Sequence, residues 1–148
     1  MLILGSFPST ASLAAQQYYA HPQNQFWRIL GAALEQPLRE MDYAVRVETV
    51  KSAGIAIWDV FASCERAGSL DTAIRDAKPN RLASLKDSVP ALRRVCFNGR
   101  MAARRIREVE ALGFEAMVLP STSPAHAGMS FAEKLALWRT ALRNNPDA

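Results

Sequence analysis

The chain has 148 residues, a hydrophobic fraction of 49% and a formal net charge of +4, which is enough for one domain with a sizeable core. Its apolar runs are too short to span a bilayer, and no basic segment precedes the first of them, so we expect neither a membrane protein nor a signal peptide. The charge excess is mostly arginine, with six between Arg93 and Arg107; such a cluster suits either a solvated helix face or nucleic-acid phosphates.

The first half of the chain predicts one strand and three helices. An apolar strand covers 2–4 and runs into the turn Gly5–Ser9. A helix is expected over 12–20 with Ser12 near its N-cap, a second over 25–34 that Pro37 stops, and an amphipathic third over 42–52.

The second half predicts three more strands and two longer helices. The strands are expected at 54–58, ending at Asp59, at 94–97 and at 114–119. Between the first two of these, 62–79 carries loop signals with one possible helical turn at 69–74, and 81–88 reads as a short helix. A strong helix is expected over 100–112 with Gly113 as its C-cap, a closing helix over 131–143, and a frayed tail over 144–148.

Strands that alternate with helices and read as continuous apolar runs predict an α/β fold with a parallel sheet covered on both faces. Ligands bind at the carboxyl ends of the strands in such sheets. Four polar features follow the predicted strands and should meet along that edge: Gly5–Ser9, Asp59, Asn98 with Gly99, and Pro120–Gly128.

Several familiar chemistries lack their motifs. The chain has no P-loop, no dinucleotide fingerprint and no nucleophile elbow. Its two cysteines, Cys64 and Cys96, and its two histidines, His21 and His126, match no metal-binding spacing, although a four-ligand zinc site is arithmetically possible. We therefore expect no metal, no cofactor and two reduced thiols in a cytoplasmic protein, associated with the nucleoid if the source is bacterial.

An aromatic and amide cluster after the first strand predicts a pocket for a flat polar ligand. Tyr19, Phe7, Phe26 and Trp27 could stack on a base, although Trp27 fits core packing better. The amide of Asn24 could position a water or a substrate, or could cap the helix that follows. Asp59 could accept from a ring N–H or act as a general base; an N-cap or loop ion-pair role fits it equally well.

Six stretches together resemble the hypoxanthine-DNA (deoxyinosine) glycosylase branch of the uracil-DNA glycosylase superfamily. In chain order they are GSFPS from Gly5, YYAHPQNQFW from Tyr18, GIAIWDV from Gly54, GSLD from Gly68, FNG from Phe97 and STSPA from Ser121. The resemblance spans nearly the whole chain. It implies a three-layer αβα sandwich around a short, mainly parallel four-stranded sheet, and a single DNA glycosylase domain over 1–148 that removes a deaminated base from DNA.

The resemblance also implies roles for individual residues. Gly5, Ser6 and Phe7 match the first motif and would bind the base, with Phe7 at the place of the catalytic acid or amide of other branches. Tyr19 would stack on the flipped base, Asp59 would read it, and Asn24 would be catalytic. The segment Ser121–Ala127 matches the second motif and is called the second-motif loop; it has Ser121 at the place of the usual histidine and would contact DNA. The expected DNA contacts are Pro8, Ser9, Ser121, Ser123, Pro124, Ala125 and His126, with Arg100 from the arginine helix.

The mechanism expected from this resemblance is monofunctional hydrolysis. The enzyme would flip the nucleotide out and break the glycosidic bond through an oxocarbenium-like sugar, and the absence of lysine from these motifs argues against a Schiff base. Two alternatives stay open: a uracil or mismatch glycosylase, and a non-catalytic nucleic-acid-binding module on the same fold. We expect a monomer acting on damaged duplex or single-stranded DNA.

Overall fold

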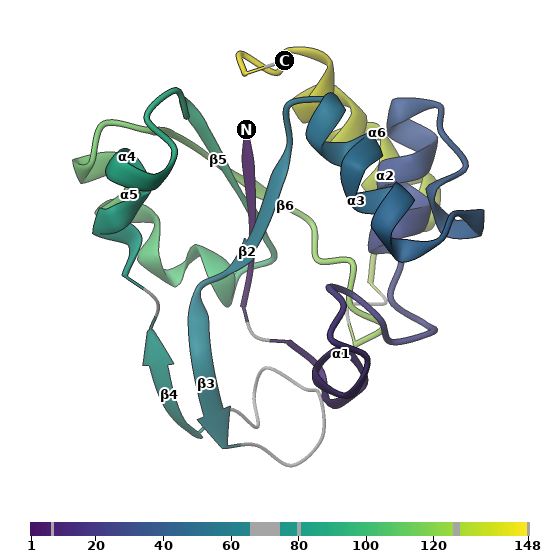
Figure 1. Ribbon diagram of the computed structural model, residues 1–148, viewed down its shortest axis with the longest axis horizontal. Coiled ribbons are helices and arrows are strands. Elements are labelled where there is room, and N and C mark those ends of the chain that lie inside the picture. The colour runs from purple at the N-terminus through teal and green to yellow at the C-terminus, as the bar shows by residue number, and fades with distance from the viewer. Residues whose placement is uncertain (7, 66–74, 80, 126–127, 148) are drawn as a thin grey trace.

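The computed structural model describes residues 1–6, 8–65, 75–79, 81–125 and 128–147, and of 61–65 and 75–79 it describes the backbone alone. Its main sheet has four strands in the order β2-β1-β5-β6, and every neighbouring pair is parallel. The strands are β1 (Leu2–Gly5), β2 (Ala56–Asp59), β5 (Arg94–Asn98) and β6 (Glu115–Leu119). The expected α/β fold with its parallel sheet is therefore confirmed (Figure 1).

The continuous apolar runs of the central strands arise because both faces of the sheet are buried. Ile3 and Cys96 point into one hydrophobic cluster, while their neighbours Leu4 and Phe97 point into the other. All four side chains are 0% exposed. Alternate residues of one strand face opposite sides, so a strand covered on both sides must be apolar at every position.

Helices form the two outer layers (Figure 1). The first cluster is covered by α2 (Phe26–Leu34), α3 (Tyr43–Ser52) and α6 (Phe131–Arg143), and the short 3₁₀ segment η1 (Leu38–Glu40) joins α2 to α3. The second is covered by α4 (Leu85–Ser88) and α5 (Ile106–Ala111), preceded by the 3₁₀ segments η3 (Leu82–Ser84) and η4 (Ala102–Arg105). No helix within the described ranges is long and apolar enough to cross a membrane.

Two predicted helices differ from the structure. The first, α1, covers Thr10–Ala15 rather than 12–20, because Ser9 and not Ser12 caps it: the Ser9 Oγ accepts from the Ser12 N–H at 3.0 Å, and Gln16 ends it in the left-handed region. The predicted helix 100–112 is a 3₁₀ segment followed by the short α5, and they meet at Arg105, whose backbone leaves helical geometry (φ −101°, ψ 19°).

The stretch 62–79 is not simply a loop. Strands β3 (Phe61–Glu65) and β4 (Arg75–Pro79) form an antiparallel pair that extends beyond the carboxyl end of β2 (Figure 1). The helical turn expected at 69–74 lies outside the described residues, as does the GSLD stretch.

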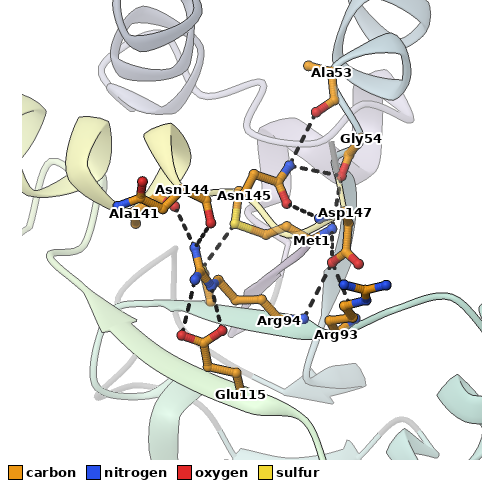
Figure 2. A network of polar contacts seen from close by, with 11 residues as sticks. Met1, Ala53, Gly54, Arg93, Arg94, Glu115, Ala141, Asn144, Asn145 and Asp147 are labelled. Atoms are coloured by element: carbon orange, nitrogen blue, oxygen red, sulfur yellow. Dashed lines mark hydrogen bonds and ion pairs between the residues drawn. The ribbon is translucent and has the colours of Figure 1, made fainter.

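The predicted frayed tail is wrong, because residues after α6 are tied to the amino-terminal end of the sheet (Figure 2). The Asp147 carboxylate forms an ion pair with the amino group of Met1 and accepts from the backbone N–H groups of Arg93 and Arg94. The Asn145 amide donates to the carbonyls of Ala53 and Gly54 at 3.2 and 3.3 Å. This polar network closes the end of the sheet opposite the carboxyl ends of the strands.

Candidate functional site

The carboxyl ends of the parallel strands meet at one edge of the sheet. The register pairs Gly5 of β1 with Asp59 of β2, and Asn98 of β5 with Leu119 of β6. The segments that follow these strands enclose a cavity of about 370 Å³, a size typical of small-ligand sites. Its walls are Gly5, Ser6, Pro8, Ser9, Ser12, Tyr18, Tyr19, His21, Gln23, Asn24, Asp59, Asn98, Ser121, Thr122, Ser123, Pro124 and Ala125.

Most of the residues expected at a site line this one cavity. Two of them, Phe7 and His126, lie outside the described residues. Arg100 is exposed and is not among the residues that line the cavity; it follows Gly99 at the end of β5. Phe26 and Trp27 do not line it either: both are buried in the core, 0% and 5% exposed, which confirms core packing for Trp27.

Two side chains crowd around the end of β1. A Cβ added to Gly5 would lie 2.6 Å from the Asp59 Oδ1 and 2.7 Å from the Tyr19 Oη, which are distances that real contacts do not reach. Only glycine fits there. The Asp59 side chain is 8% exposed, so a carboxyl group and a phenol oxygen stand together on one side of the first-strand turn.

Tyr19 is held in an unusual backbone conformation. Its φ is +55°, in the left-handed region, which costs a non-glycine residue of the order of 1–3 kcal/mol. Its ring stacks on Phe26 with the centroids 3.9 Å apart and the planes 19° from parallel. Phe26 is fully buried at the start of α2, so it forms a firm backing for the ring that lines the cavity.

The orientation of the Asn24 amide follows from one hydrogen bond. The Phe26 N–H donates to the Asn24 Oδ1 at 2.9 Å, and because only the oxygen can accept, the nitrogen Nδ2 must point the other way. The N-cap of helix α2 is Gln25 and not Asn24. Asn24 contributes to the start of the helix only by accepting the hydrogen bond from the Phe26 N–H. Within the described part of the chain Nδ2 donates to no protein group, so Asn24 offers a hydrogen-bond donor to the cavity that it lines.

Tyr18 adds a second neutral donor. Burial, together with the charge of Asp59 and the neighbouring Tyr43, raises the pKa of its phenol to about 12. The hydroxyl therefore stays protonated across the physiological range. The cavity combines the donors Asn24 and Tyr18 with the carboxyl group of Asp59, a polarity that suits a flat heterocycle with both acceptors and an N–H.

The second-motif loop is held by its own hydroxyl groups and by β5. The Ser121 and Ser123 Oγ atoms accept from the backbone N–H two residues on, at 3.1 and 3.2 Å, as in serine turns. Thr122 is fully buried and bonds to Asn98, and its carbonyl accepts from the Gln25 N–H at 2.9 Å. This last bond joins the loop to the residue next to Asn24.

The cavity includes residues that sequence reasoning did not assign to a site. Tyr18, His21 and Gln23 belong to the aromatic segment, Asn98 is the last residue of β5, and Thr122 belongs to the loop after β6; both of these strand ends are expected at this edge. Their position within those segments was the only sequence feature that could have indicated that they line the cavity. Ser12 carried no such signal, because it was expected to cap a helix and instead is buried, with its Oγ accepting from the Ala20 N–H at 3.0 Å.

Two basic residues have structural contacts near the site. Arg105 donates to the Val60 carbonyl at 3.3 Å and pairs with Glu108, so it ties the arginine segment to the residue after Asp59. Lys134 of α6 is 2% exposed, burial lowers its pKa, and its Nζ lies 3.5 Å from the Gln25 Oε1. Lys134 is not among the residues that line the cavity.

Comparison with known proteins identifies the family. The profile of the uracil DNA glycosylase superfamily matches residues 1–143. The chain is 44% identical over 130 residues to a hypoxanthine DNA glycosylase of Methanosarcina acetivorans, covering 88% of this chain and 82% of the relative. It is 40% identical over 126 residues to a hypoxanthine DNA glycosylase of Methanosarcina barkeri, covering 85% and 80%.

A solved structure agrees with these relatives. The solution NMR structure of a candidate uracil DNA glycosylase from Methanosarcina acetivorans superposes with a TM-score of 0.86 at 42% identity, covering 96% of this chain and 88% of the other. The fold with its parallel sheet thus belongs to a known architecture. The chain is a member of the uracil DNA glycosylase superfamily.

Proposed function

We propose that residues 1–148 form a single DNA glycosylase domain that flips a deaminated base, hypoxanthine above all, out of DNA and hydrolyses its bond to the sugar. One observation carries the proposal: the cavity brings Gly5, Tyr19, Asn24 and Asp59 together from three separate segments. The two relatives named as hypoxanthine DNA glycosylases support the choice of base. The protein would act as a monomer in the cytoplasm, on damaged duplex or single-stranded DNA.

The base would be held on its face and its edge. Tyr19, backed by Phe26, offers a ring on which a flipped purine can stack. The turn Gly5–Phe7 would supply backbone donors. Asp59 would accept from the N1–H of hypoxanthine, a hydrogen that adenine lacks, so this carboxylate favours the deaminated base over its parent.

The chemical role of Asn24 follows from its orientation. Glycosidic cleavage leaves positive charge on the sugar and electrons on the departing base. With its oxygen bonded to the Phe26 N–H, Asn24 has Nδ2 to offer, and a donor aimed at an atom that gains negative charge stabilises the transition state. We therefore infer that Asn24 stabilises the leaving base, in preference to orienting water through Oδ1.

The surrounding loops would contact the DNA backbone. Pro8 and Ser9 from the first loop, and Ser121, Ser123, Pro124 and Ala125 from the second, line the cavity and are partly or fully accessible. His126 continues the second loop in the sequence, and Arg100 would add a phosphate contact from the exposed start of the arginine segment.

The primary test is excision from matched duplexes that carry deoxyinosine, deoxyuridine or deoxyxanthosine at one position. We expect release of hypoxanthine under single-turnover conditions, with an abasic product. Release of uracil alone would assign a mismatch or uracil glycosylase instead. Tight binding to the deoxyinosine or abasic duplex without any base release would make the protein a binding module. Borohydride should trap no covalent complex, since hydrolysis needs no Schiff base.

A pair of substitutions tests Asn24 directly. Asn24→Asp keeps an oxygen for the Phe26 N–H but removes the Nδ2 donor, while Asn24→Ala removes both. We expect both variants to lose excision by about 10²–10³-fold, the usual cost of one transition-state donor, while Asn24→Asp keeps the stability of the parent protein. An Asn24→Asp enzyme with full activity would rule out the donor role. For base reading, Asp59→Asn should reduce the preference for hypoxanthine over adenine.

A further inference from the structure

Three hydrogen bonds hold the backbone on both sides of Tyr19. The Tyr18 N–H donates to the Tyr43 Oη at 3.1 Å, and the Trp27 Nε1 donates to the Tyr18 carbonyl at 2.9 Å. On the other side, the Ala20 N–H donates to the Ser12 Oγ at 3.0 Å. The partners come from α1, α2 and α3, so three elements converge on the residues that flank one aromatic side chain.

We propose that Ser12, Trp27 and Tyr43 are positioning residues that hold Tyr19 in its left-handed conformation, so that its ring is in place for the flipped base before DNA arrives. The inference rests on the proposed function, since it concerns the wall of the same cavity. It adds two residues that do not line the cavity, Trp27 and Tyr43, to those on which base binding depends.

The backbone of this segment needs hydrogen bonds from other elements to hold its conformation. Gln16 and Tyr19 both have positive φ, +54° and +55°, and neither is a glycine, so the chain between them has no intrinsic preference for this path. A conformation of this kind persists only when its surroundings determine it, and it is found at ligand sites where preorganisation matters. The hydrogen bonds that Tyr18 and Ala20 make with residues of three helices fix the backbone conformation on both sides of Tyr19.

The direction of the Tyr19 ring depends directly on this backbone. The ring lies 3.9 Å from Phe26, stacked, and a change of φ toward the usual negative region would swing the side chain away from that partner. Binding energy that would otherwise order the wall is then available for flipping the nucleotide, because the wall is ordered in the free protein.

Tyr43 offers a clean substitution. Its ring packs edge-on against Trp27, with the centroids 6.1 Å apart and the planes at 89°, and its hydroxyl accepts from the Tyr18 N–H. Tyr43→Phe removes the acceptor and keeps the ring. Ser12→Ala likewise removes the acceptor for the Ala20 N–H. Thr49→Val on the same helix as Tyr43 is the matched control, since the Thr49 hydroxyl bonds to the Val45 carbonyl at 2.8 Å and to the Met41 Sδ at 3.6 Å, both away from Tyr18 and Ala20.

The first measurement is amide hydrogen exchange in the free protein. Tyr43→Phe should accelerate exchange of the Tyr18 amide, and Ser12→Ala that of the Ala20 amide, by at least about tenfold, because each loses its acceptor. Thr49→Val should change neither amide. Unchanged exchange in the first two variants would show that these bonds do not hold the segment and would overturn the inference.

The second measurement is a double-mutant cycle with Tyr19→Ala. In the parent background we expect Tyr43→Phe to slow single-turnover excision of hypoxanthine about five- to tenfold, the fold-change of one lost hydrogen bond. In the Tyr19→Ala background it should slow excision less than about twofold, since the residue it positions is gone. Equal slowing in both backgrounds would mean a general effect on the fold, and no slowing in the parent would mean no positioning; either result contradicts the inference.

A readout of flipping keeps the cycle measurable where excision is slow. A 2-aminopurine placed beside deoxyinosine brightens when its neighbour leaves the stack, and it reports flipping without base release. We expect Tyr43→Phe to reduce this fluorescence increase in the parent background and to change it little in the Tyr19→Ala background. A parent protein that fails to excise hypoxanthine would refute the proposed function. A fully active parent with an unaffected Tyr43→Phe variant would refute only the positioning of Tyr19.

Discussion

Asn98 and Thr122 exchange two hydrogen bonds across the carboxyl edge of the sheet. The Asn98 Nδ2 donates to the Thr122 Oγ1 at 2.9 Å, and the Thr122 N–H donates to the Asn98 Oδ1 at 3.0 Å. Both residues are buried, 8% and 0% exposed. Since the Thr122 carbonyl also accepts from the Gln25 N–H, the end of β5, the second-motif loop and the start of α2 form one connected unit.

Breaking this pair should lower stability and activity together. Thr122→Val replaces the hydroxyl by a methyl group and leaves the Asn98 Nδ2 buried without its acceptor, which costs about 1–3 kcal/mol. Excision should fall as well, because the Thr122 carbonyl that accepts from the Gln25 N–H would be held less firmly, and Gln25 is next to Asn24 in the chain. Urea unfolding and single-turnover excision check both effects. The control is Thr140→Val on α6, whose hydroxyl is exposed and bonds to the Ala136 carbonyl; a comparable loss there would contradict this explanation.

Gly5→Ala should disable the cavity. The new methyl group would lie 2.6 Å from the Asp59 Oδ1 and 2.7 Å from the Tyr19 Oη, so at least one of these side chains must move. We expect excision to fall at least about tenfold and the midpoint of urea unfolding to drop, since overpacking a buried site costs roughly 1–3 kcal/mol. Gly128→Ala is the matched control, because a Cβ there meets nothing within 4 Å. Full activity of Gly5→Ala would show that excision does not depend on the positions of Asp59 and Tyr19 found here.

The sheet and the edge that carries the site could be predicted from the sequence, because the central strands β1 and β5 are buried on both faces and each of the four strands is followed by polar, proline or glycine residues. Periods of apolar residues also placed α2, α3 and α6 within a residue or so. Helix α1 was misplaced because Ser9 and Ser12 are equally good caps in sequence, and only the Ser12 to Ala20 contact decides between them. Long-range partners of this kind leave no local pattern.

The roles of polar side chains depended on contacts that the sequence does not contain. Nothing in the order of residues says that Asn24 turns its oxygen to Phe26 and so presents a donor. The tail after α6 read as frayed because it is short, polar and terminal, yet Asp147 lies against a charged amino group 146 positions away in the chain, at Met1. Both the orientation of Asn24 and the placement of the tail depend on hydrogen bonds rather than on apolar packing, which is the part that periodicity predicts well.

Tyr18 should titrate at an unusually high pH. Burial first, and then the charge of Asp59, raises its pKa from 10.0 to about 12. The neutral phenol is thus favoured in the folded state, so its contribution to stability is complete below pH 10 and is lost as the pH rises toward 12. The absorbance of ionised tyrosine, followed against pH, should show one residue that ionises at a higher pH than the others, and Tyr18→Phe should remove that step. A Tyr18→Phe variant that loses stability as steeply as the parent over this alkaline range would argue against the shift.

Asp147 should make stability depend on acid pH. Burial alone would raise the pKa of its carboxyl, but hydrogen bonds from the Met1 amino group and from the backbone N–H groups of Arg93 and Arg94, with the nearby charge, hold it below its ordinary value. A depressed folded pKa gives stability that is present above the unfolded pKa and is lost as the pH falls through the folded one. Asp147→Asn should therefore be less stable than the parent at neutral pH, by about 1–3 kcal/mol for a charged hydrogen-bonded group. The difference should vanish below the folded pKa, where the parent carboxyl is protonated too. Urea unfolding across this range checks it, with Glu110→Gln as the exposed control on α5; a difference that persists unchanged in acid would assign the effect to packing and not to charge.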